Sequence, residues 1–329
     1  MQSLSNISVD PGRVQADDSF HVVFCVDDRY FRCMGATIAS ILEHNPQRHF
    51  TFHVMATKVS AFNSQRFESL SSRLGIRTCI HLLDPSMFER FEPYTRSSYY
   101  SSAIFTRLVI PDVLKSYTDR VLYLDADILC MGSIDALAGL DLGDDIVAVV
   151  PDAKVTTERR VAALQLKYPR YFNSGMLYIN ISRWLDAGIS QQTIDAFLKN
   201  GERFRFPDQD ALNVVLDGRA RFIDIRWNYL YGLVGDLEGN RPALGIDPGA
   251  ATFIHFAGSV KPWGAWCGHD SVKLFEHYHA QSAWSDLPLD MQPQNYKEAR
   301  MHSRFLWARG KRLESLRWYA HYLRMRRHR

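Results

Sequence analysis

A short apolar segment that ends in two acids constrains this chain more than any other feature. Residues 121–124 (Val-Leu-Tyr-Leu) are continuously apolar, and Asp125 and Asp127 follow before the apolar character returns at Ile128. Such a run is typical of a buried strand. Because an unpaired buried carboxylate is costly, two of them require a cation or several hydrogen-bond donors. Residues i and i+2 of an extended chain point to the same side, so both carboxylates could bind one divalent cation such as Mg²⁺ or Mn²⁺.

A simpler arrangement also fits this pair. One aspartate could cap the next turn while the other is hydrated, and for a bare Asp-x-Asp this arrangement is the more common one. The apolar residues before the pair favour the cation site without deciding between the two interpretations.

The order of segments predicts an α/β fold with a mostly parallel sheet and helices on both faces. We expect strands at 20–26, 51–55, 76–83, 121–124, 147–150, 172–181, 221–225 and 252–256. We expect helices at 34–45, 62–74, 99–114 and 189–198, and one that begins at Pro207. Ligands of open α/β sheets bind beyond the carboxyl ends of the strands. Four expected strands end near Asp27, Asp125, Asp152 and His255, which predicts a site at that edge.

Composition limits the class of protein. The chain has 329 residues, of which 46% are hydrophobic, and no run approaches the 18 apolar residues of a membrane-spanning helix. Residues 1–19 lack the basic-then-apolar pattern of a secretory signal, so we expect a loose leader there. The cysteines form no CxxC pair, which argues against a zinc ribbon and favours a reducing cytoplasm. They are Cys25, Cys33, Cys79, Cys130 and Cys267.

Positive charge is concentrated at the C-terminus. Residues 304–329 hold nine Lys and Arg and one acid, so this tail carries +8 while the rest of the chain carries −5. A slightly acidic body argues against nucleic-acid binding. The apolar residues of the tail have the spacing of one helical face, and they are Leu306, Leu313, Leu316, Ala320 and Leu323. A basic amphipathic helix predicts docking on an anionic membrane surface; the alternative is a helix packed on the body with its charges hydrated.

Three polar clusters outside the central pair could bind a ligand. Asp27 and Asp28 could accept hydrogen bonds from a base or ribose, or cap a helix, and the residues favour neither. Asn173 could bind a sugar hydroxyl, although a simple turn is the more common role for such a residue. Asp208-Gln209-Asp210 follow Pro207 at a helix start and are more polar than one cap requires. Gln209 is a poor nucleophile but could stabilise a developing cation.

The segment from His255 to Trp263 offers a second set of ligands. A lone histidine after an apolar strand is more often a core residue than a ligand, yet a neutral imidazole can join two carboxylates on manganese. Lys261, six residues later, could neutralise a phosphate as a point charge. Together these residues would suit a metal–diphosphate.

Several motifs in order, over residues 20–266, resemble those of family-8 glycosyltransferases, which transfer a sugar from a nucleotide donor with retention of anomeric configuration. They are residues 24–30 (Phe-Cys-Val-Asp-Asp-Arg-Tyr), 124–128 (Leu-Asp-Ala-Asp-Ile), 171–177 (Tyr-Phe-Asn-Ser-Gly-Met-Leu), 208–210 (Asp-Gln-Asp), 226–228 (Arg-Trp-Asn) and 255–263. The resemblance implies a single Rossmann-like nucleotide-binding domain of the glycosyltransferase A type.

The resemblance also implies roles for individual residues. Asp125, Asp127 and His255 would bind Mn²⁺ or Mg²⁺. Gly258 and Lys261 would hold the diphosphate. The donor-binding residues would further include Cys25, Asp27, Arg29, Tyr30, Arg107, Ala126 and Asn173, with Asp27 on the uracil. The catalytic residues would be Gln209, Asp208 and Asp152. Relatives often place Asn where this chain has Arg29, so base contacts there are less defined.

The C-terminal extension is similar to that of bacterial lipopolysaccharide core transferases, on the basis of residues 296–300 (Tyr-Lys-Glu-Ala-Arg) and the basic, aromatic end. This implies UDP-glucose or UDP-galactose as donor, a lipid-linked core oligosaccharide as acceptor, and a cytoplasmic protein peripherally bound to the inner face of the bacterial inner membrane. We expect a leader at 1–19, a catalytic domain at 20–266 and a helical, membrane-associating extension at 267–329. The alternatives are transfer to a capsular glycan or protein, a UDP-sugar hydrolase, or a non-catalytic UDP-sugar-binding protein.

Overall fold

The computed structural model describes residues 19–91, 102–239, 241, 243–247 and 249–327. The expected leader falls outside this part except for Ser19, and so do residues 99–101 of the helix expected at 99–114. The chain divides into two compact units. The first comprises Met1–Phe31, Asn45–Ala126 and Ser133–Asn228, and the second Arg32–His44, Asp127–Gly132 and Tyr229–Arg329.

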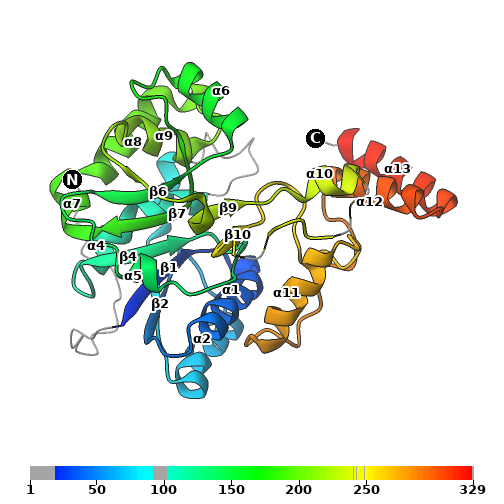
Figure 1. Ribbon diagram of the computed structural model, residues 1–329, viewed down its shortest axis with the longest axis horizontal. Coiled ribbons are helices and arrows are strands. Elements are labelled where there is room, and N and C mark those ends of the chain that lie inside the picture. The colour runs from blue at the N-terminus through cyan, green and yellow to red at the C-terminus, as the bar shows by residue number, and fades with distance from the viewer. Residues whose placement is uncertain (1–18, 92–101, 240, 242, 248, 328–329) are drawn as a thin grey trace. The chain divides into compact units, whose positions relative to one another are not determined.

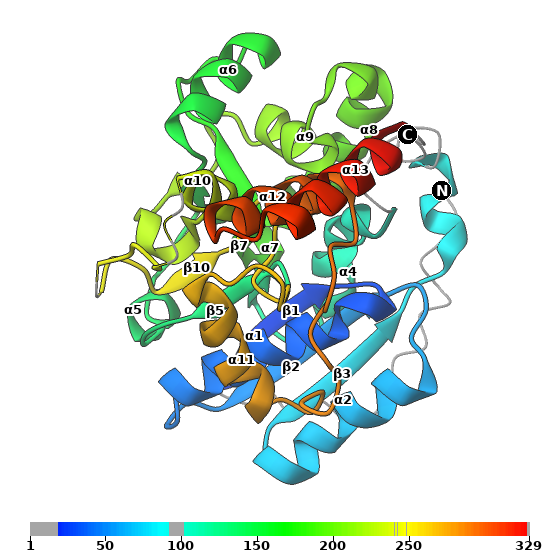
Figure 2. The same cartoon turned by 90° about the vertical axis from the view of Figure 1, so that its right-hand side faces the viewer.

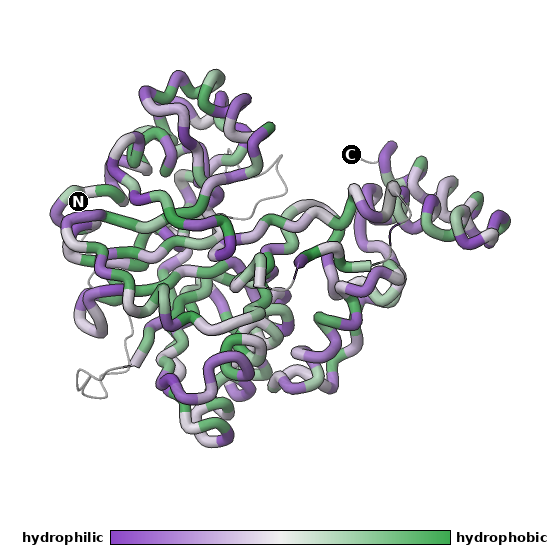
Figure 3. The backbone as a smooth tube through the Cα atoms, viewed as in Figure 1, coloured by the Kyte–Doolittle hydropathy of each residue, from purple (hydrophilic) through white to green (hydrophobic). Residues whose placement is uncertain are grey.

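The first unit is built on a seven-stranded sheet in the order β3-β2-β1-β4-β7-β6-β8 (Figure 1). The strands are β1 (Phe20–Cys25), β2 (Phe50–Ala56), β3 (Arg77–Leu82), β4 (Arg120–Leu124), β6 (Val147–Pro151), β7 (Phe172–Asn180) and β8 (Arg221–Phe222). Strands β1 to β4 pair in parallel, whereas β7 runs antiparallel to both β4 and β6. The predicted mostly parallel sheet is confirmed. The apolar runs that predicted these strands appear as hydrophobic stretches in Figure 3.

Helices and 3-10 turns connect these strands. They are η1 (Asp28–Tyr30), α2 (Ala61–Leu74), η2 (Pro85–Phe91), η3 (Ser102–Val109), α4 (Ile110–Leu114), α5 (Asp135–Ala138), α6 (Lys154–Leu164), α7 (Ile181–Asp186), α8 (Ile189–Asn200), η4 (Gly201–Arg203), α9 (Pro207–Val215) and η5 (Ile225–Asn228). Rings from η2, η3 and α8 meet in the core: the Phe105 centroid lies 4.1 Å from that of Phe91 and 4.7 Å from that of Phe197. This packing fixes η3, which carries Arg107.

One expectation for the first unit is wrong in part, and one helix was not expected at all. The strand expected at 221–225 ends at Phe222, because Ile225 already begins the turn η5. Helix α6 was not expected, and its sequence explains why. Its buried residue is Arg160, a cation, so α6 has no apolar stripe to indicate a helix.

Three buried histidines form a ladder across β1, β2 and β3. His21 Nδ1 lies 2.9 Å from His53 Nε2, and His53 Nδ1 lies 3.0 Å from His81 Nε2. The Tyr117 ring packs edge-on against His53 and His81. Burial lowers the pKa of His53 well below its ordinary value and lowers that of His81 to about 4. Both imidazoles are therefore neutral at pH 7.

The second unit contains a three-stranded sheet in the order β5-β10-β9. Its elements are α1 (Phe31–His44), β5 (Ile128–Cys130), β9 (Tyr229–Leu230), α10 (Leu233–Glu238), β10 (Phe253–His255), α11 (Asp270–Gln281), α12 (Tyr296–Ala308) and α13 (Arg312–Arg327). Strand β10 pairs antiparallel with β5, which sets His255 opposite Ile128. The expectation that His255 ends a strand of the same sheet as Asp125 is wrong, because β10 pairs with β5 and β9 in a separate sheet of strands only two or three residues long.

Helix α1 packs against the segment after α11. A Cβ atom on Gly35 would lie 2.4 Å from the Trp284 ring, so glycine is required for this close approach. At the end of α1, His44 Nε2 lies 3.0 Å from the Tyr278 hydroxyl. Residues more than 200 positions apart thus share one small core.

The C-terminal tail forms two helices rather than one. Helices α12 and α13 are separated at residues 309–311, where Gly310 has a φ of +75° that L side chains rarely adopt. The two helices lie side by side in both views (Figure 2). Ser303 Oγ donates to Ser315 O over 2.8 Å, and Ser315 Oγ donates to Ser303 O over 2.7 Å.

This reversal corrects the expected helical face. Leu306 lies on α12 and is buried, whereas Leu313, Leu316 and Leu323 lie on α13 and are exposed. Within the described residues, no helix combines the length and apolar character needed to cross a membrane.

Candidate active site

Asp125 directly follows β4, at the end of the buried run that the sequence indicated. Its backbone N–H donates to Gly175 O over 2.8 Å, which continues the pairing of β4 with β7. The Tyr123 hydroxyl donates to its carboxylate. Arg107 Nη2 lies 3.3 Å from Asp125 Oδ1. The Asp125 carboxylate is therefore oriented by a hydroxyl and a guanidinium.

Arg107 joins Asp125 to a second buried acid, Asp208. Arg107 Nη1 lies 2.9 Å from Asp208 Oδ2 and donates to Ser174 Oγ over 2.9 Å and to Ser174 O over 3.0 Å. Burial opposes charge on Arg107, but Asp208 and Asp125 raise its pKa above the ordinary value. Burial raises the pKa of Asp208 against the lowering effect of Arg107. A guanidinium buried between two carboxylates keeps its charge and fixes their positions.

Gln209 is the centre of a group that we call the amide network, which comprises Asp152, Tyr171, Asn173, Ser174 and Gln209. Gln209 Oε1 accepts from Ser174 N over 3.0 Å and from Asn173 Nδ2 over 3.2 Å. Gln209 Nε2 donates to Asp152 Oδ2 and to the Tyr171 hydroxyl, both over 3.0 Å. The first turn of α9 places Gln209 here, and Pro207 at its start needs no hydrogen-bond acceptor.

Asp210, two residues after Asp208 on α9, has a different environment. It is 0% exposed and accepts five hydrogen bonds. Arg160 Nε and Nη2 donate over 3.0 and 2.7 Å, and the Tyr171 hydroxyl donates over 2.6 Å. The backbone N–H groups of Arg205 and Phe206 donate over 2.7 and 3.0 Å. The Asp210 carboxylate is thus fully occupied by protein donors.

The segment after β1 forms a capped turn. Asp27 Oδ1 accepts from Arg29 N over 3.0 Å, and Asp27 Oδ2 pairs with the Arg29 guanidinium at 3.1 Å. The Arg29 side chain is 85% exposed, and Tyr30 is also exposed. Burial raises the pKa of the Cys25 thiol to about 12, so this partly buried cysteine is neutral and packs against the core. Asp27 therefore performs the capping role, and its carboxylate remains partly exposed.

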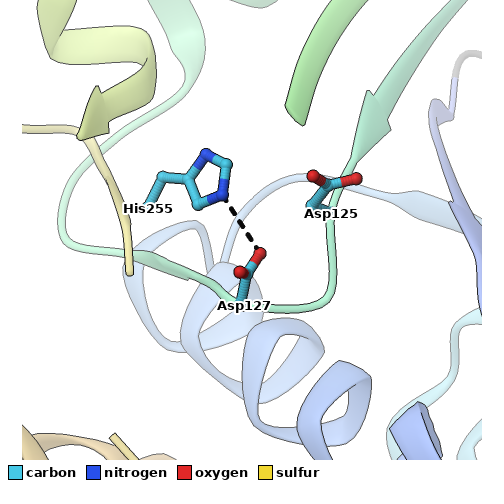
Figure 4. Close-up of side chains that lie close together, drawn as sticks. All are labelled: Asp125, Asp127 and His255. Carbon is cyan, nitrogen blue, oxygen red and sulfur yellow. Dashed lines mark ion pairs between the residues drawn. The ribbon is translucent and has the colours of Figure 1, made fainter. Parts of the chain in front are cut away.

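The second unit contributes Asp127, His255 and Lys261. His255 Nε2 lies 3.2 Å from Asp127 Oδ1, as Figure 4 shows, and Lys261 Nζ lies 2.5 Å from Asp127 Oδ2. Lys261 also donates to Phe256 O over 2.9 Å. Burial alone would raise the pKa of Asp127, but Lys261 and His255 hold it well below its usual range. Between His255 and Lys261, Gly258 has a φ of +105°, which favours glycine.

Asp125, Asp127 and His255 form a group of side chains that could hold a metal ion. Asp125 and Asp127 are separated by Ala126 alone, where the chain passes from the first unit to the second. The set fits a divalent cation, because Asp127 stays ionised and imidazole with carboxylate oxygens suits manganese. Further ligands would come from the substrate.

The structure distributes the candidate residues over three places. Those that it joins in one hydrogen-bonded group in the first unit are Arg107, Asp125, Asp152, Asn173, Asp208 and Gln209. Asp127, His255 and Lys261 lie together in the second unit, and Cys25, Asp27, Arg29 and Tyr30 lie at the end of β1. The sequence reasoning missed Tyr171, Ser174 and Arg160 as members. Tyr171 and Ser174 lay within the 171–177 motif, whereas no local signal marked Arg160.

Comparison with known sequences decides the family. The sequence model described as glycosyl transferase family 8 matches residues 21–267, and that of the family-8 C-terminal region matches residues 270–325. The chain belongs to glycosyl transferase family 8. The resemblance inferred from the motifs is confirmed.

This family-8 glycosyltransferase is similar to two lipopolysaccharide transferases. It is 33% identical over 279 residues to the lipopolysaccharide 1,3-galactosyltransferase of Salmonella typhimurium, covering 83% of this chain and 81% of that protein. It is 28% identical over 287 residues to a lipopolysaccharide 1,2-glucosyltransferase of Escherichia coli, covering 84% and 83%. Its fold is that of the galactosyltransferase LgtC, crystallised with donor and acceptor sugar analogues: the TM-score is 0.66 at 23% identity, covering 84% of this chain and 99% of that chain.

Proposed function

We propose that this enzyme transfers glucose or galactose from a UDP-sugar to the lipopolysaccharide core oligosaccharide, with retention of configuration and with Mn²⁺ or Mg²⁺. The observation that carries the proposal is the cluster of Asp127, His255 and Lys261, which combines metal-ligand chemistry with a cation suited to phosphate. The two relatives named as lipopolysaccharide transferases support the acceptor class.

Asp125, Asp127 and His255 would hold the divalent cation. A bound cation would act as a Lewis acid toward the departing diphosphate. Lys261 is a flexible ammonium that could turn from Asp127 to a phosphate oxygen and offset charge there. Gly258, in the same loop, has free space around its Cα atom, since a Cβ atom there would meet nothing within 4 Å. A phosphate could therefore approach the backbone at Gly258.

The first unit would hold the donor sugar. Arg107, Asp152, Asn173 and Asp208 offer fixed donors and acceptors for hydroxyl groups, as a polar sugar requires. Asp27 remains partly exposed and could accept a hydrogen bond from uracil. The carboxylate arrangement bears on the mechanism, because retaining hydrolases place a carboxylate nucleophile below the sugar ring.

Neither acid beside Gln209 suits that nucleophilic role. Asp210 is fully occupied by five donors, and Asp208 is paired with Arg107. We therefore favour front-face attack, in which the acceptor hydroxyl enters on the side that the diphosphate leaves and a phosphate oxygen takes its proton. A covalent sugar adduct on Asp208 or Asp210, found by mass spectrometry of the quenched enzyme, would contradict this mechanism.

Exposed residues of α13 support docking at the inner face of the bacterial inner membrane. Leu313 is 77% exposed and Leu316 57% exposed, and neighbouring positions carry Arg312, Arg317 and Arg324. Apolar side chains among arginines suit the interface of an anionic bilayer. The full chain with Leu313, Leu316 and Leu323 changed to Ser should sediment less with phosphatidylglycerol-containing vesicles than the wild type. Equal sedimentation would contradict the proposal.

The decisive experiment for the activity is a panel of UDP-sugars with Mn²⁺, with and without a defined core acceptor. We expect UDP release that depends on the acceptor, with UDP-glucose or UDP-galactose as donor, and a product heavier by one hexose. UDP release without the acceptor would instead indicate a hydrolase. Binding without turnover would indicate a UDP-sugar-binding protein, and transfer to a capsular glycan or protein alone would change the acceptor.

A further inference from the structure

A chain of hydrogen bonds lies behind Gln209 and runs through three side chains. Arg160 on α6 binds Asp210 on α9 through two hydrogen bonds, of 3.0 and 2.7 Å. Asp210 accepts from the Tyr171 hydroxyl over 2.6 Å, and that hydroxyl lies 3.0 Å from Gln209 Nε2. Arg160, Asp210 and Gln209 are each less than one-tenth exposed, and so is Tyr171.

The chemistry of these groups allows one direction for every bond. A guanidinium only donates and an ionised carboxylate only accepts. Because Asp210 can only accept, the Tyr171 hydroxyl must give its proton to Asp210. Its oxygen is then left to accept, so the side of the Gln209 amide that faces Tyr171 must be the NH₂ group.

We propose that Arg160, Asp210 and Tyr171 form a positioning relay that fixes the orientation of the Gln209 amide. The proposal rests on the proposed function of Gln209 at the donor sugar. With NH₂ toward Tyr171 and Asp152, the carbonyl oxygen faces Ser174 N and Asn173 Nδ2. A flipped amide would set its carbonyl against the Asp152 carboxylate and its NH₂ against the Ser174 N–H, so four hydrogen bonds would be lost.

The relay also fixes Asn173. Asn173 Nδ2 donates to Gln209 Oε1 over 3.2 Å and to Asp152 Oδ2 over 3.3 Å, because both are acceptors. Asn173 Oδ1 then accepts from Gly175 N over 3.0 Å and from Asn228 Nδ2 over 2.9 Å. Asp210, paired with Arg160, and the Asp152 carboxylate thereby favour the same donor and acceptor pattern in two neutral amides.

The relay predicts different roles for two acids that flank one glutamine. Asp208 pairs with Arg107, which also contacts Asp125. Asp210 faces Arg160 and Tyr171 and acts on the substrate only through Gln209. We therefore assign Asp210 and Tyr171 as positioning residues rather than catalytic residues.

The test is Tyr171→Phe in the full-length enzyme, which removes one hydroxyl and keeps the ring. We expect kcat with UDP-hexose, Mn²⁺ and core acceptor to fall about 10- to 100-fold, the range for a misplaced group near the reacting atoms. Tyr168→Phe is the matched control, since Tyr168 lies on the same segment and is 45% exposed; its kcat should stay within about twofold of wild type.

A double-mutant cycle separates positioning from a general structural effect. If Tyr171 acts through Gln209, Tyr171→Phe combined with Gln209→Ala should lose no more kcat than Gln209→Ala alone. The relay would be overturned if the kcat losses of the two single variants multiplied in the double variant. It would also be overturned if Tyr171→Phe were as active as the wild type. Calorimetric binding of UDP and UDP-hexose to each variant gives a second readout: Tyr171→Phe should keep the affinity for UDP and weaken that for UDP-hexose. A wild type that neither binds nor turns over UDP-hexose would overturn the proposed function instead.

Discussion

Two groups of candidate residues, one in each unit, differ in how their charges are held. In the amide network and around Arg107, protein donors and acceptors pair with one another inside the first unit, and only Arg107 Nε among these described groups is buried without a hydrogen-bond partner. In the second unit, Asp127 is held by Lys261, a flexible ammonium, and by His255, an imidazole that can also bind metal. The first arrangement is held by protein partners, whereas we expect a bound ligand to displace Lys261 from Asp127.

This difference suggests different tasks for the two groups. Hydrogen-bonded networks that are fully satisfied are rigid and specify one arrangement. An acid held by lysine and histidine can release the lysine when another cation arrives. We expect substitutions in the second unit to affect metal and diphosphate binding, and substitutions in the amide network to affect the reaction of the sugar.

The largest expected effect is that of Asp127→Asn. It removes a charged ligand and leaves Lys261 without its carboxylate, so kcat should fall at least about 1,000-fold, as for the loss of a main electrostatic element. UDP release in Mn²⁺ measures this. Asp144→Asn is the control, because its side chain is 92% exposed. Activity near the wild-type value in Asp127→Asn would show that the metal assignment is wrong.

Gln209→Glu should come next, with a loss of about 100-fold at pH 8. The introduced carboxylate would lie where Gln209 Nε2 now lies, 3.0 Å from Asp152 Oδ2, and like charges raise the pKa of such a pair. As the pH falls, a proton on the introduced carboxylate would restore the bond to Asp152, so kcat should recover toward pH 5 relative to the wild type. A pH–rate profile parallel to that of the wild type would contradict this explanation.

The Lys261→Met substitution should have a smaller effect, of about tenfold on the KM for UDP-sugar, since one phosphate partner is lost. The same change removes the competitor for Asp127, so Mn²⁺ should bind more tightly in the absence of nucleotide. Calorimetry with Mn²⁺ and donor kinetics test the two opposite shifts. Lys273→Met on α11, where the lysine is 80% exposed, should change neither. Weaker Mn²⁺ binding by Lys261→Met would contradict the proposed exchange.

The smallest effect on turnover should come from the histidine ladder, which belongs to neither group. His81→Asn should change kcat at pH 7 by less than about twofold. In the wild type, the unfolded state binds a proton at His81 below pH 6.5, whereas the folded state does so only near its lower pKa of about 4. The free energy of unfolding should therefore fall as pH drops from 6.5 to 4, by about 1–3 kcal/mol for this group. The free energy of unfolding, measured with guanidinium at pH 5 and 7.5, should depend less on pH in His81→Asn than in the wild type.

The sequence predicted those parts of the fold that local patterns determine. Residues 121–124 form most of β4, and all four side chains are buried. Pro207 begins α9. Both signals are local, because an apolar run and a proline at a helix start need no distant partner. The sheet that carries His255 was not predictable in this way. A three-residue strand has too little pattern to show that it pairs with β5, more than 120 residues earlier.

Residues whose role depends on a distant partner were also missed. Arg160 resembles a hydrated cation on a polar helix, and only Asp210, 50 positions later, explains its burial. The reversal at Gly310 was missed because an apolar spacing that fits one helix continues by chance across the turn. Leu306 and Leu313 keep that spacing while lying on different helices.

The second unit is assembled from segments that lie far apart in the chain, and this has a consequence for synthesis on the ribosome. Helix α1 and strand β5 belong to this unit, yet their partners β10, Tyr278 and Trp284 are encoded far downstream. At about 5–20 residues per second, α1 would wait roughly 10–50 seconds for Trp284 to be made. During that interval its apolar side chains are a target for chaperones. A chain that stops before residue 284 would leave α1 without this partner permanently.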